Sequence, residues 1–544
     1  MSFSSLLFAG KGASMVSCFS LKYLFCFLPL CIFMYSLVPK TWKKYFLLVA
    51  SCLFYWLISG KLILYLLLSV LSMHYFGLWI DRIRDKMQRQ LAEIQKEEKK
   101  IVRKAYISRM RRIVILAVFI HICVLLIVKY TGFFATNLNT FLSIIKSPLV
   151  LVVPKTLMPI GISFFTLQAL SYIFDVYHGV VKADENIFRL ALFLCFFPQI
   201  VEGPICRYAQ TAEQLWDAKP IRHDNLIMGL QRILYGMIKK IIIADRLNPL
   251  VEAVFSYYYY CEGGIIAIGV ICYTIQLYMD FSGTMDVVIG TAQIFGFELP
   301  ENFKQPFFSK TISEFWQRWH ITLGTWFKDY LFYPITSSGR MKKLTAFARK
   351  KVGNHYGPLS AGSIALFCVW FCNGLWHGSA WNYIFFGMYH FSLILCGNLI
   401  APLVHRINQK LHINPNHFMY RLLQVLRSVI LIMIGELFFR AHGLQAGIYM
   451  FKKMITNFSF STWNDELMMK VGIDRLDLFI VGVTLVIVFV VSIMNERGVS
   501  IRSHIMKKKM FVRWTVEIAM ILFLIVFGAY GIGYAAVDPL YAQF

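Results

Sequence analysis

Charged residues are scarce in this sequence. Only 15% of its 544 residues are Asp, Glu, Lys or Arg, whereas soluble domains carry roughly 25%. No hydrophilic stretch is long enough to form a soluble domain of its own. These absences exclude an ordinary water-soluble surface. We therefore predict an all-α integral membrane protein, a polytopic helical bundle that forms a single membrane domain over residues 1–544.

Acidic residues are scarcer than basic ones. The 29 Asp and Glu stand against 55 Lys and Arg, which gives a formal net charge of +26. Such a charge can indicate nucleic-acid binding, but no zinc-finger spacing or RNA-binding motif accompanies it. Cytoplasmic loops of membrane proteins retain Lys and Arg, which is sufficient cause. We predict no nucleic-acid partner, although these loops can also meet anionic lipid or an acidic cytosolic protein.

Paired cysteines are missing as well. Most of the 12 Cys lie in apolar runs and none forms a Cys-x-x-Cys pair. Since a buried cysteine usually behaves as a small hydrophobic residue, we expect neither disulfides nor a metal site, and no tightly bound cofactor. A cleavable signal is not expected either, because the first apolar run starts near Leu21 and continues as a full span.

Long apolar runs are what the sequence has in abundance. At roughly 20 residues per span, they predict about 11–13 transmembrane or re-entrant helices. Several runs are short or interrupted by polar residues, and these we expect to be re-entrant or buried within the bundle. The runs are Leu21–Pro39, Tyr45–Ile58, Leu62–Ile80, Ile113–Tyr130, Leu157–Val176, Ile187–Val201, Leu226–Ile243, Ile265–Met279, Ile364–Trp376, Trp381–Ala401, Leu426–Phe439, Leu478–Met494 and Phe511–Gly533.

The basic loops predict the orientation. Lys40–Lys44 and Asp81–Arg112 are both rich in Lys and Arg and are separated by two spans, so they lie on the same, cytoplasmic side and the N-terminus is outside. Asp81–Arg112 has no Gly or Pro and predicts a long helix at the cytoplasmic surface that joins two spans; a docking surface is the alternative. Arg340–Lys351 and Arg497–Arg513 are further candidate cytoplasmic loops.

Polar residues inside apolar runs are costly and need a reason. Gln168, Tyr172 and Asp175 fall at spacings of four and three, so they share one helical face. They either bond neighbouring helices or line a substrate path. Two prolines and a glycine then interrupt the next run around Gln199 and Glu202. A broken helix at membrane depth is tolerated only where it is buried or lines a cavity.

A second polar group contains Gln276, Asp280 and Asp286. The two aspartates are six residues apart, so one helical face would not carry both. This spacing argues against a pair of catalytic carboxylates. It favours the alternative that each aspartate holds a basic partner in place.

A third group begins with Thr311 and Glu314, which fit a capping box and predict the start of a helix. This helix would continue as an interfacial helix with an aromatic belt. It carries Trp316, Trp319 and His320. A structural role for this histidine is as well supported by composition as a functional one.

The fourth group surrounds His377, which lies between Trp376 and Gly378 in a strongly apolar run. Gly374 and Gly378 are four residues apart and would let another backbone approach closely. Asn373 lies one turn before the histidine. An unperturbed histidine titrates near pH 6.5, and apolar surroundings favour its neutral form, so His377 is a candidate general base. A buried structural histidine is the alternative.

Taken together, these groups resemble a known family. WQRWHITLGTWFKDYLFYPI and GLWHGSAWNYIFFGMYH are similar to the two histidine motifs of the membrane-bound O-acyltransferase (MBOAT) family. PIGISFFTLQALSYIFDVY, FFPQIVEGPI and DFSGTMD resemble further family blocks. The alginate O-acetyltransferase branch of the family is resembled at both ends of the chain, by the start, MSFSSLLF with FLPLCIFMYSLVP, and by FFRA and the final LYAQF. This branch is related to the D-alanyl transfer proteins of teichoic acid modification. Thr284, where the family often has Tyr, and the extra residues Lys11–Ser20 depart from the pattern and leave the acceptor open.

The resemblance implies the MBOAT fold, with a funnel from each side of the membrane that meets at the second histidine. Residues 158–390 would form the core with the catalytic motifs, and residues 391–544 would add C-terminal spans. His377 would be the main catalytic residue and His320 would assist or position. The residues expected to line the substrate path are Asn373, Trp376, Trp316, Trp319, Gln168, Glu202, Gln276 and Asp280.

The implied reaction takes an acyl group, acetyl above all, from a cytosolic thioester such as acetyl-CoA or an acyl carrier. The acceptor would be a hydroxyl of an extracytoplasmic polysaccharide or of a partner acyltransferase. Such an enzyme would lie in a bacterial cytoplasmic membrane. Transfer of D-alanyl groups to teichoic acid is one alternative, and a membrane transporter of an acylated or small substrate is another.

Overall fold

The computed structural model describes residues 19–20, 22–153 and 158–530. Outside these residues lie the expected blocks MSFSSLLF and LYAQF and the extra residues from Lys11 up to residue 18. The predicted run ends at Leu21, Leu157 and Gly533 lie outside them as well. In the described part the chain is helical, without strands beyond an isolated bridge between Phe303 and Trp319. Its contacts group it into two compact units, Met1–Leu230 with Val288–Pro300 and Gln231–Val287 with Glu301–Phe544.

Apolar helices dominate both units. Among the described residues, eight helices are long and apolar enough to cross a membrane. The expected all-α, multi-pass membrane protein is therefore confirmed. These helices are Lys40–Glu93, counted as one although the 3-10 turn Gly60–Leu62 divides it, Lys99–Ile144, Gly263–Ile294, Gly339–His377, Trp381–Lys410, Phe418–Arg440, Arg475–Glu496 and Met510–Phe527.

The interrupted runs form shorter helices. The first unit contains α6 (Ile162–His178) and α7 (Ile187–Cys195), and nearly every residue of α6 is buried. At 1.5 Å per residue, the nine residues of α7 extend only about 13 Å, much less than a hydrocarbon core of about 30 Å. As predicted, the chain leaves the helix before Gln199 and turns through Glu202.

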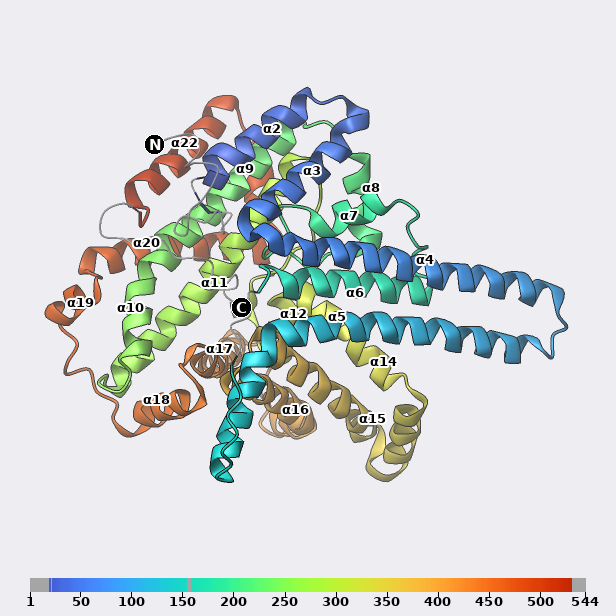
Figure 1. Ribbon diagram of the computed structural model, residues 1–544. Helices are drawn as coiled ribbons and strands as arrows, with labels where there is room; N and C mark the ends of the chain where they lie inside the picture. Colours follow the sequence, from blue (N-terminus) through green and yellow to red (C-terminus); the bar gives the residue numbers. More distant parts are fainter. Residues whose placement is uncertain (1–18, 21, 154–157, 531–544) are drawn as a thin grey trace. The chain divides into compact units, whose positions relative to one another are not determined.

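In the first unit, α4 (Ile63–Glu93) packs against α5 (Lys99–Ile144), α6 and α7 (Figure 1). The remaining helices of this unit are α2 (Leu28–Leu37), α3 (Lys40–Ser59) and α8 (Tyr208–Asp217).

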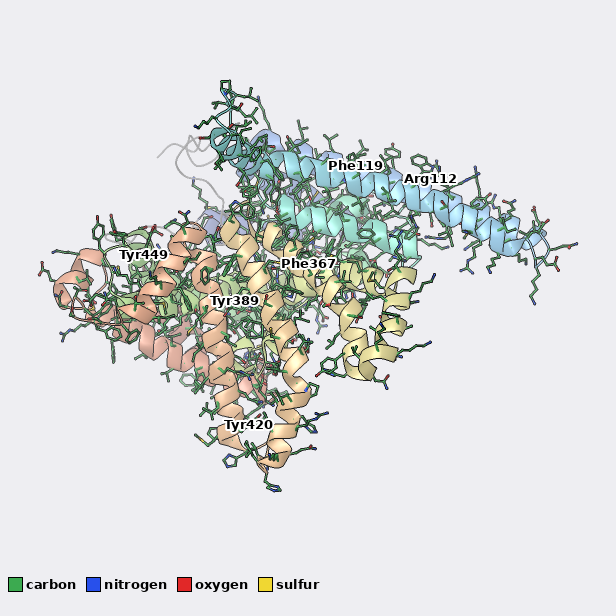
Figure 2. All side chains as sticks on the ribbon, turned by 90° about the horizontal axis from the view of Figure 1, so that it is seen from below. Arg112, Phe119, Phe367, Tyr389, Tyr420 and Tyr449 are labelled. Carbon is green, nitrogen blue, oxygen red and sulfur yellow. The ribbon has the colours of Figure 1, made fainter. Side chains whose placement is uncertain are left out.

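The basic segment Asp81–Arg112 is not a separate helix that joins two spans, and that prediction was wrong. Helix α4 continues to Glu93 and α5 begins at Lys99, so the segment is the end of an antiparallel hairpin (Figure 1). Figure 2 shows Phe119 and Arg112 along the same helix, α5. No Gly or Pro stops either helix where its apolar run ends, so both continue into the charged sequence.

The second unit contains α15 (Gly339–His377), α16 (Trp381–Lys410) and α17 (Phe418–Arg440), which pack in sequence order. Figure 2 shows Tyr420 at the far end of the α16–α17 hairpin from Tyr389. The predicted loop Arg340–Lys351 is helical and forms the start of α15, which bends at Gly353. The other helices of this unit are α10 (Asp245–Ser256), α12 (Ile312–Arg318), α13 (Ile321–Phe327), α14 (Tyr333–Thr336), α18 (Leu444–Thr456), α19 (Asp465–Val471), α20 (Arg475–Glu496), α21 (Ile501–Met506) and α22 (Met510–Phe527).

Helices α9 (His223–Met237) and α11 (Gly263–Ile294) each begin in one unit and end in the other. A π-helical turn, η3 (Ile238–Ala244), follows α9 and belongs to the second unit. Ile238 and Ile242 of this turn pack against Leu524 of α22 in a hydrophobic cluster. The two histidine motifs also lie in the second unit.

Candidate active site

His377 is the last residue of α15 and is 2% exposed. The chain leaves the helix at Gly378 in an extended conformation, and α16 begins at Trp381. Three aromatic rings surround the imidazole edge-on. The ring centroids lie 4.9 Å away for Trp376, 5.1 Å for Phe439 and 5.9 Å for Phe386. The candidate base therefore stands in an apolar enclosure formed by α15, α16 and α17.

The predicted close approach at the two glycines is present. A Cβ atom at Gly374 would stand 2.5 Å from the carbonyl oxygen of Tyr383, and one at Gly378 would stand 2.2 Å from the Tyr383 ring. Any larger side chain would push α16 away from the end of α15. The glycines thus fix the helix pair that holds His377.

His320 lies in a break between two short helices. Thr311 accepts from the Glu314 amide and starts α12 as predicted, but the helix ends at Arg318 and α13 begins at Ile321. The expected continuous helix was wrong at this point. His320 has a φ of 44°, a left-handed conformation that interrupts a helix. The backbone here bonds instead to the segment that precedes α12, with Ile321 N donating to Asn302 O at 3.0 Å.

Asn302 also fixes the His320 ring. Its Oδ1 accepts from Thr322 N at 3.0 Å and from Thr322 Oγ1 at 2.7 Å, and His320 Nδ1 faces it at 3.4 Å. An oxygen that accepts from these donors requires a proton on His320 Nδ1. The lone pair of the neutral ring is then on Nε2. Burial lowers the pKa of His320 to about 3, so the ring is neutral near pH 7.

A single indole contacts both predicted histidines. The Trp376 ring lies 5.6 Å from the His320 ring and 4.9 Å from the His377 ring, centroid to centroid. These three residues come from segments almost 60 positions apart in the chain. The structure therefore brings the two histidine motifs together around Trp376.

Asn373 adds an unused polar group. It lies one turn before His377 on α15 and is 8% exposed. Its Oδ1 is buried and has no hydrogen-bond partner among the described residues. Leaving such a group unsatisfied costs roughly 1–3 kcal/mol, so a bound substrate atom would be stabilised there.

Known proteins resemble this chain over most of its length. Residues 180–348 match the model of the membrane-bound O-acyltransferase family. The chain is 33% identical to the probable alginate O-acetylase AlgI of Pseudomonas aeruginosa over 444 residues, which are 81% of this chain and 74% of that protein. This chain belongs to the MBOAT family. It is accordingly an O-acyltransferase of the membrane.

Two further relatives are named for other activities. The peptidoglycan O-acetyltransferase of Helicobacter pylori is 27% identical over 448 residues, 77% of this chain and 74% of that protein. The teichoic acid D-alanyltransferase of Bacillus subtilis is 32% identical over 252 residues, 44% of this chain and 58% of that protein.

The aspartates of this MBOAT chain hold basic partners, which is the alternative that their spacing favoured. Asp280 binds Lys240 at 2.6 Å, and Asp286 binds Lys239 at 2.6 Å and Arg232 at 2.9 Å. Gln276, by contrast, donates to Asn248 at 2.8 Å, while its Oε1 is buried without a partner in the described part of the chain. Asp280 is therefore engaged in an ion pair, whereas Gln276 still has one oxygen that could accept a hydrogen bond.

Two predicted lining residues belong to the first unit. Gln168 is buried on α6, and Glu202 is buried in the turn after α7. The other eight predicted residues belong to the second unit. A role of Gln168 and Glu202 in the substrate path stays a prediction.

Sequence reasoning missed three polar residues near the MBOAT histidines. Nothing in the sequence marks Asn302 as a site residue, because asparagine is common between helices. His390 and Glu436 did give one, since each is an isolated ionisable residue within an apolar span. Both line a small cavity together with the predicted residues Trp316 and Trp319.

Proposed function

We propose that this MBOAT enzyme passes an acyl group, acetyl above all, from a cytosolic thioester across the membrane to an extracytoplasmic hydroxyl. The hydroxyl would belong to a polysaccharide or to a partner acyltransferase. The observation that supports this proposal most is the meeting of His377 and His320 on the Trp376 ring, beside the unsatisfied amide of Asn373.

In the proposed reaction, His377 accepts the proton of the acceptor hydroxyl while the hydroxyl oxygen attacks the thioester carbonyl. The tetrahedral intermediate then collapses and the C–S bond breaks. The proton on His377 goes to the departing thiolate. One ester and one thiol replace one alcohol and one thioester, so the imidazole ends in its starting state.

The intermediate carries a negative oxygen that needs a hydrogen-bond donor. The Asn373 side chain is one turn from His377, and its NH₂ group is a hydrogen-bond donor. We assign its NH₂ group to this oxygen. The neutral His320, whose ring also contacts Trp376, would position the hydroxyl.

The acyl group is the finer question. The relatives that match most of the chain are named for acetyl transfer to alginate or peptidoglycan, while the relatives named for D-alanyl transfer match less of it. Acetyl is therefore the proposed group and D-alanyl the alternative. The expected acceptor chemistry is a sugar hydroxyl in either case.

Purified protein assayed with acetyl-CoA, acetyl and D-alanyl carrier proteins, and polysaccharide acceptors tests the proposal. His377→Ala should reduce transfer to background while the protein remains folded in detergent, and His320→Ala should lower it. His405→Ala, at an exposed histidine on α16, is the matched control and should retain activity. Near-normal turnover by His377→Ala contradicts the assigned role, and a wild type inactive with every donor contradicts the proposed function.

A further inference from the structure

A small cavity lies beside the site in the second unit, between α11, α12, α16 and α17. Its packing leaves room for roughly one water molecule. Most of its wall is aliphatic or aromatic. Its two ionisable residues are His390 of α16 and Glu436 of α17.

His390 is fully buried, and one of its ring nitrogens is engaged. Trp316 Nε1 donates to His390 Nδ1 at 3.3 Å. Since Nδ1 accepts, the neutral imidazole carries its proton on Nε2. That Nε2 has no hydrogen-bond partner among the described residues. It lies against Gly435, where a Cβ would stand 2.6 Å away.

Glu436 is the opposite case, an acceptor with too few donors. Glu436 is 4% exposed, and its carboxyl group accepts from the Thr274 hydroxyl of α11. Within the described part of the chain no cation pairs with it. A buried carboxyl group costs free energy unless further hydrogen bonds reach it. One unused donor and one under-used acceptor thus line the same water-sized cavity.

We infer that this cavity holds one ordered water, which accepts from His390 Nε2–H and donates to the Glu436 carboxyl group. A cavity of this size holds water only where polar groups can bond to it, and here His390 and Glu436 provide one donor and one acceptor. The resulting chain of hydrogen bonds runs from Trp316 through His390, the water and Glu436 to Thr274. It connects α12, α16, α17 and α11, and leaves each of these polar groups with a partner.

Trp316 joins these hydrogen-bonded residues to the catalytic region through ring contacts. Its ring lies 4.8 Å from Trp370 of α15 and 5.9 Å from Phe386 of α16. Phe386 in turn lies 5.9 Å from the His377 ring. The water-linked residues therefore hold the first histidine motif against the helices that carry the second. His390 and Glu436 are positioning residues for acyl transfer, a role that rests on the proposed function.

A double-mutant cycle tests the link. His390→Asn keeps an acceptor for Trp316 but removes the Nε2 donor, and Glu436→Leu removes the carboxyl group at similar size. Each should lower kcat about 10-fold with little change in KM, in the range seen for residues that orient a catalytic group. The double variant should also lose about 10-fold, because one water couples the two. A loss of about 100-fold, the product of independent effects, overturns the inference.

Two further variants separate positioning from general disruption of α17. Glu436→Gln keeps polar atoms for Thr274 and the water, and should restore most of the activity lost in Glu436→Leu. Ser428→Ala changes a buried residue two turns away on the same helix and should leave kcat unchanged. Failure of the glutamine variant to restore kcat, or an equal loss in Ser428→Ala, contradicts a specific link.

The water itself can be observed independently of activity. A high-resolution map of the wild-type protein should show one density peak between His390 Nε2 and the Glu436 carboxyl group. The melting temperatures of the four proteins in the cycle should show the same non-additivity as kcat. A dry cavity overturns the inference even if acyl transfer is confirmed, and both measurements remain decisive if the proposed function fails.

Discussion

At the scale of single residues, His320 shows how a neighbour can set the state of a buried imidazole. Asn302 supplies an uncharged acceptor at Nδ1, 3.4 Å away, so it fixes the tautomer without adding charge. Burial alone then lowers the pKa of the ring to about 3. Because this pKa is below the ordinary value of about 6.5, His320 remains neutral when the pH falls from 7 to 5, and its Nε2 lone pair is preserved.

Asn302→Asp should reverse that condition. A carboxylate beside Nδ1 stabilises the imidazolium and raises the pKa of His320, typically by 1–3 units for a close opposite charge. The ring then becomes protonated at a higher pH and loses its lone pair. From about 3 in the wild type, a rise of 1–3 units brings the pKa of His320 to about 4–6. We therefore expect kcat to fall at a higher pH than in the wild type, measured by acyl transfer between pH 4 and 9.

Thr322→Val is the control for this change. Its hydroxyl donates to the same Asn302 Oδ1 at 2.7 Å. The valine variant removes a donor without adding charge, so the acid limb should remain where it is in the wild type. Equal profiles for the Asp variant and the wild type would exclude Asn302 as the residue that sets this imidazole.

The residues of the site differ in how far the sequence predicts them. His377, Trp376 and Asn373 are neighbours on one helix, so the motif alone groups them. The partners of Trp316 and Thr274 could not be predicted, because His390 and Glu436 lie 74 and 162 positions further along the chain. Contacts of that kind depend on how helices pack, and a single sequence contains no direct record of it.

At the scale of elements, the π-helical turn η3 explains two neighbouring buried lysines. Lys239 and Lys240 follow each other in the chain, and both point to α11, where their partners Asp286 and Asp280 are six residues apart. Asp245 adds a second carboxylate to Lys240 at 2.7 Å. The spacing of the aspartates predicted that each holds a base, but it could not say which, because the bases come from another helix.

Lys240→Met should be strongly destabilising. Lys240 and Asp280 are almost completely buried, with side-chain exposures of 2% and 1%. Removing one partner of a buried pair leaves an uncompensated charge and typically costs 3–5 kcal/mol. We expect a large drop in the melting temperature in detergent, part of which Asp280→Asn should restore in the double variant.

The exposed pair Lys470–Glu466 offers a matched comparison. Its ammonium and carboxylate are 2.6 Å apart, as close as in the buried pair, but both side chains are 71% exposed. Surface pairs contribute only about 0–1 kcal/mol, so Lys470→Met should hardly change the melting temperature. Similar shifts for both lysines would show that Lys240 is not held as a buried ion-pair partner.

Helix boundaries were predicted less well than helix content. The sequence indicated a break around Gln199 and a start at Thr311, because Pro, Gly and a capping box are local signals. It did not indicate the break at His320, where the backbone bonds to Asn302 instead of continuing the helix. Nor did it place the turn of the α4–α5 hairpin at residues 94–98, since nothing but helix-forming residues surrounds it.

At the scale of the whole molecule, helix length bears on the membrane. The 31 residues of α4 extend about 46 Å and the 46 residues of α5 about 69 Å at 1.5 Å per residue. Both exceed a hydrocarbon core of about 30 Å. The excess includes the basic part of the hairpin, Asp81–Arg112, which is too polar for lipid. The hairpin end must therefore stand in water on one side of the membrane.

The side on which it stands is a prediction with a direct test. Lys and Arg are retained on the cytoplasmic side, so residue 95 at the hairpin turn should be cytoplasmic, and Lys61, at the opposite end of α4, should be external. Both positions are exposed. In intact cells an impermeant maleimide should label Lys61→Cys but not Gln95→Cys. In permeabilised cells it should label both variants more strongly than the unsubstituted protein, whose own cysteines give the background signal. Labelling of Gln95→Cys alone in intact cells would invert the orientation, and would place the thioester donor on the side of Lys61.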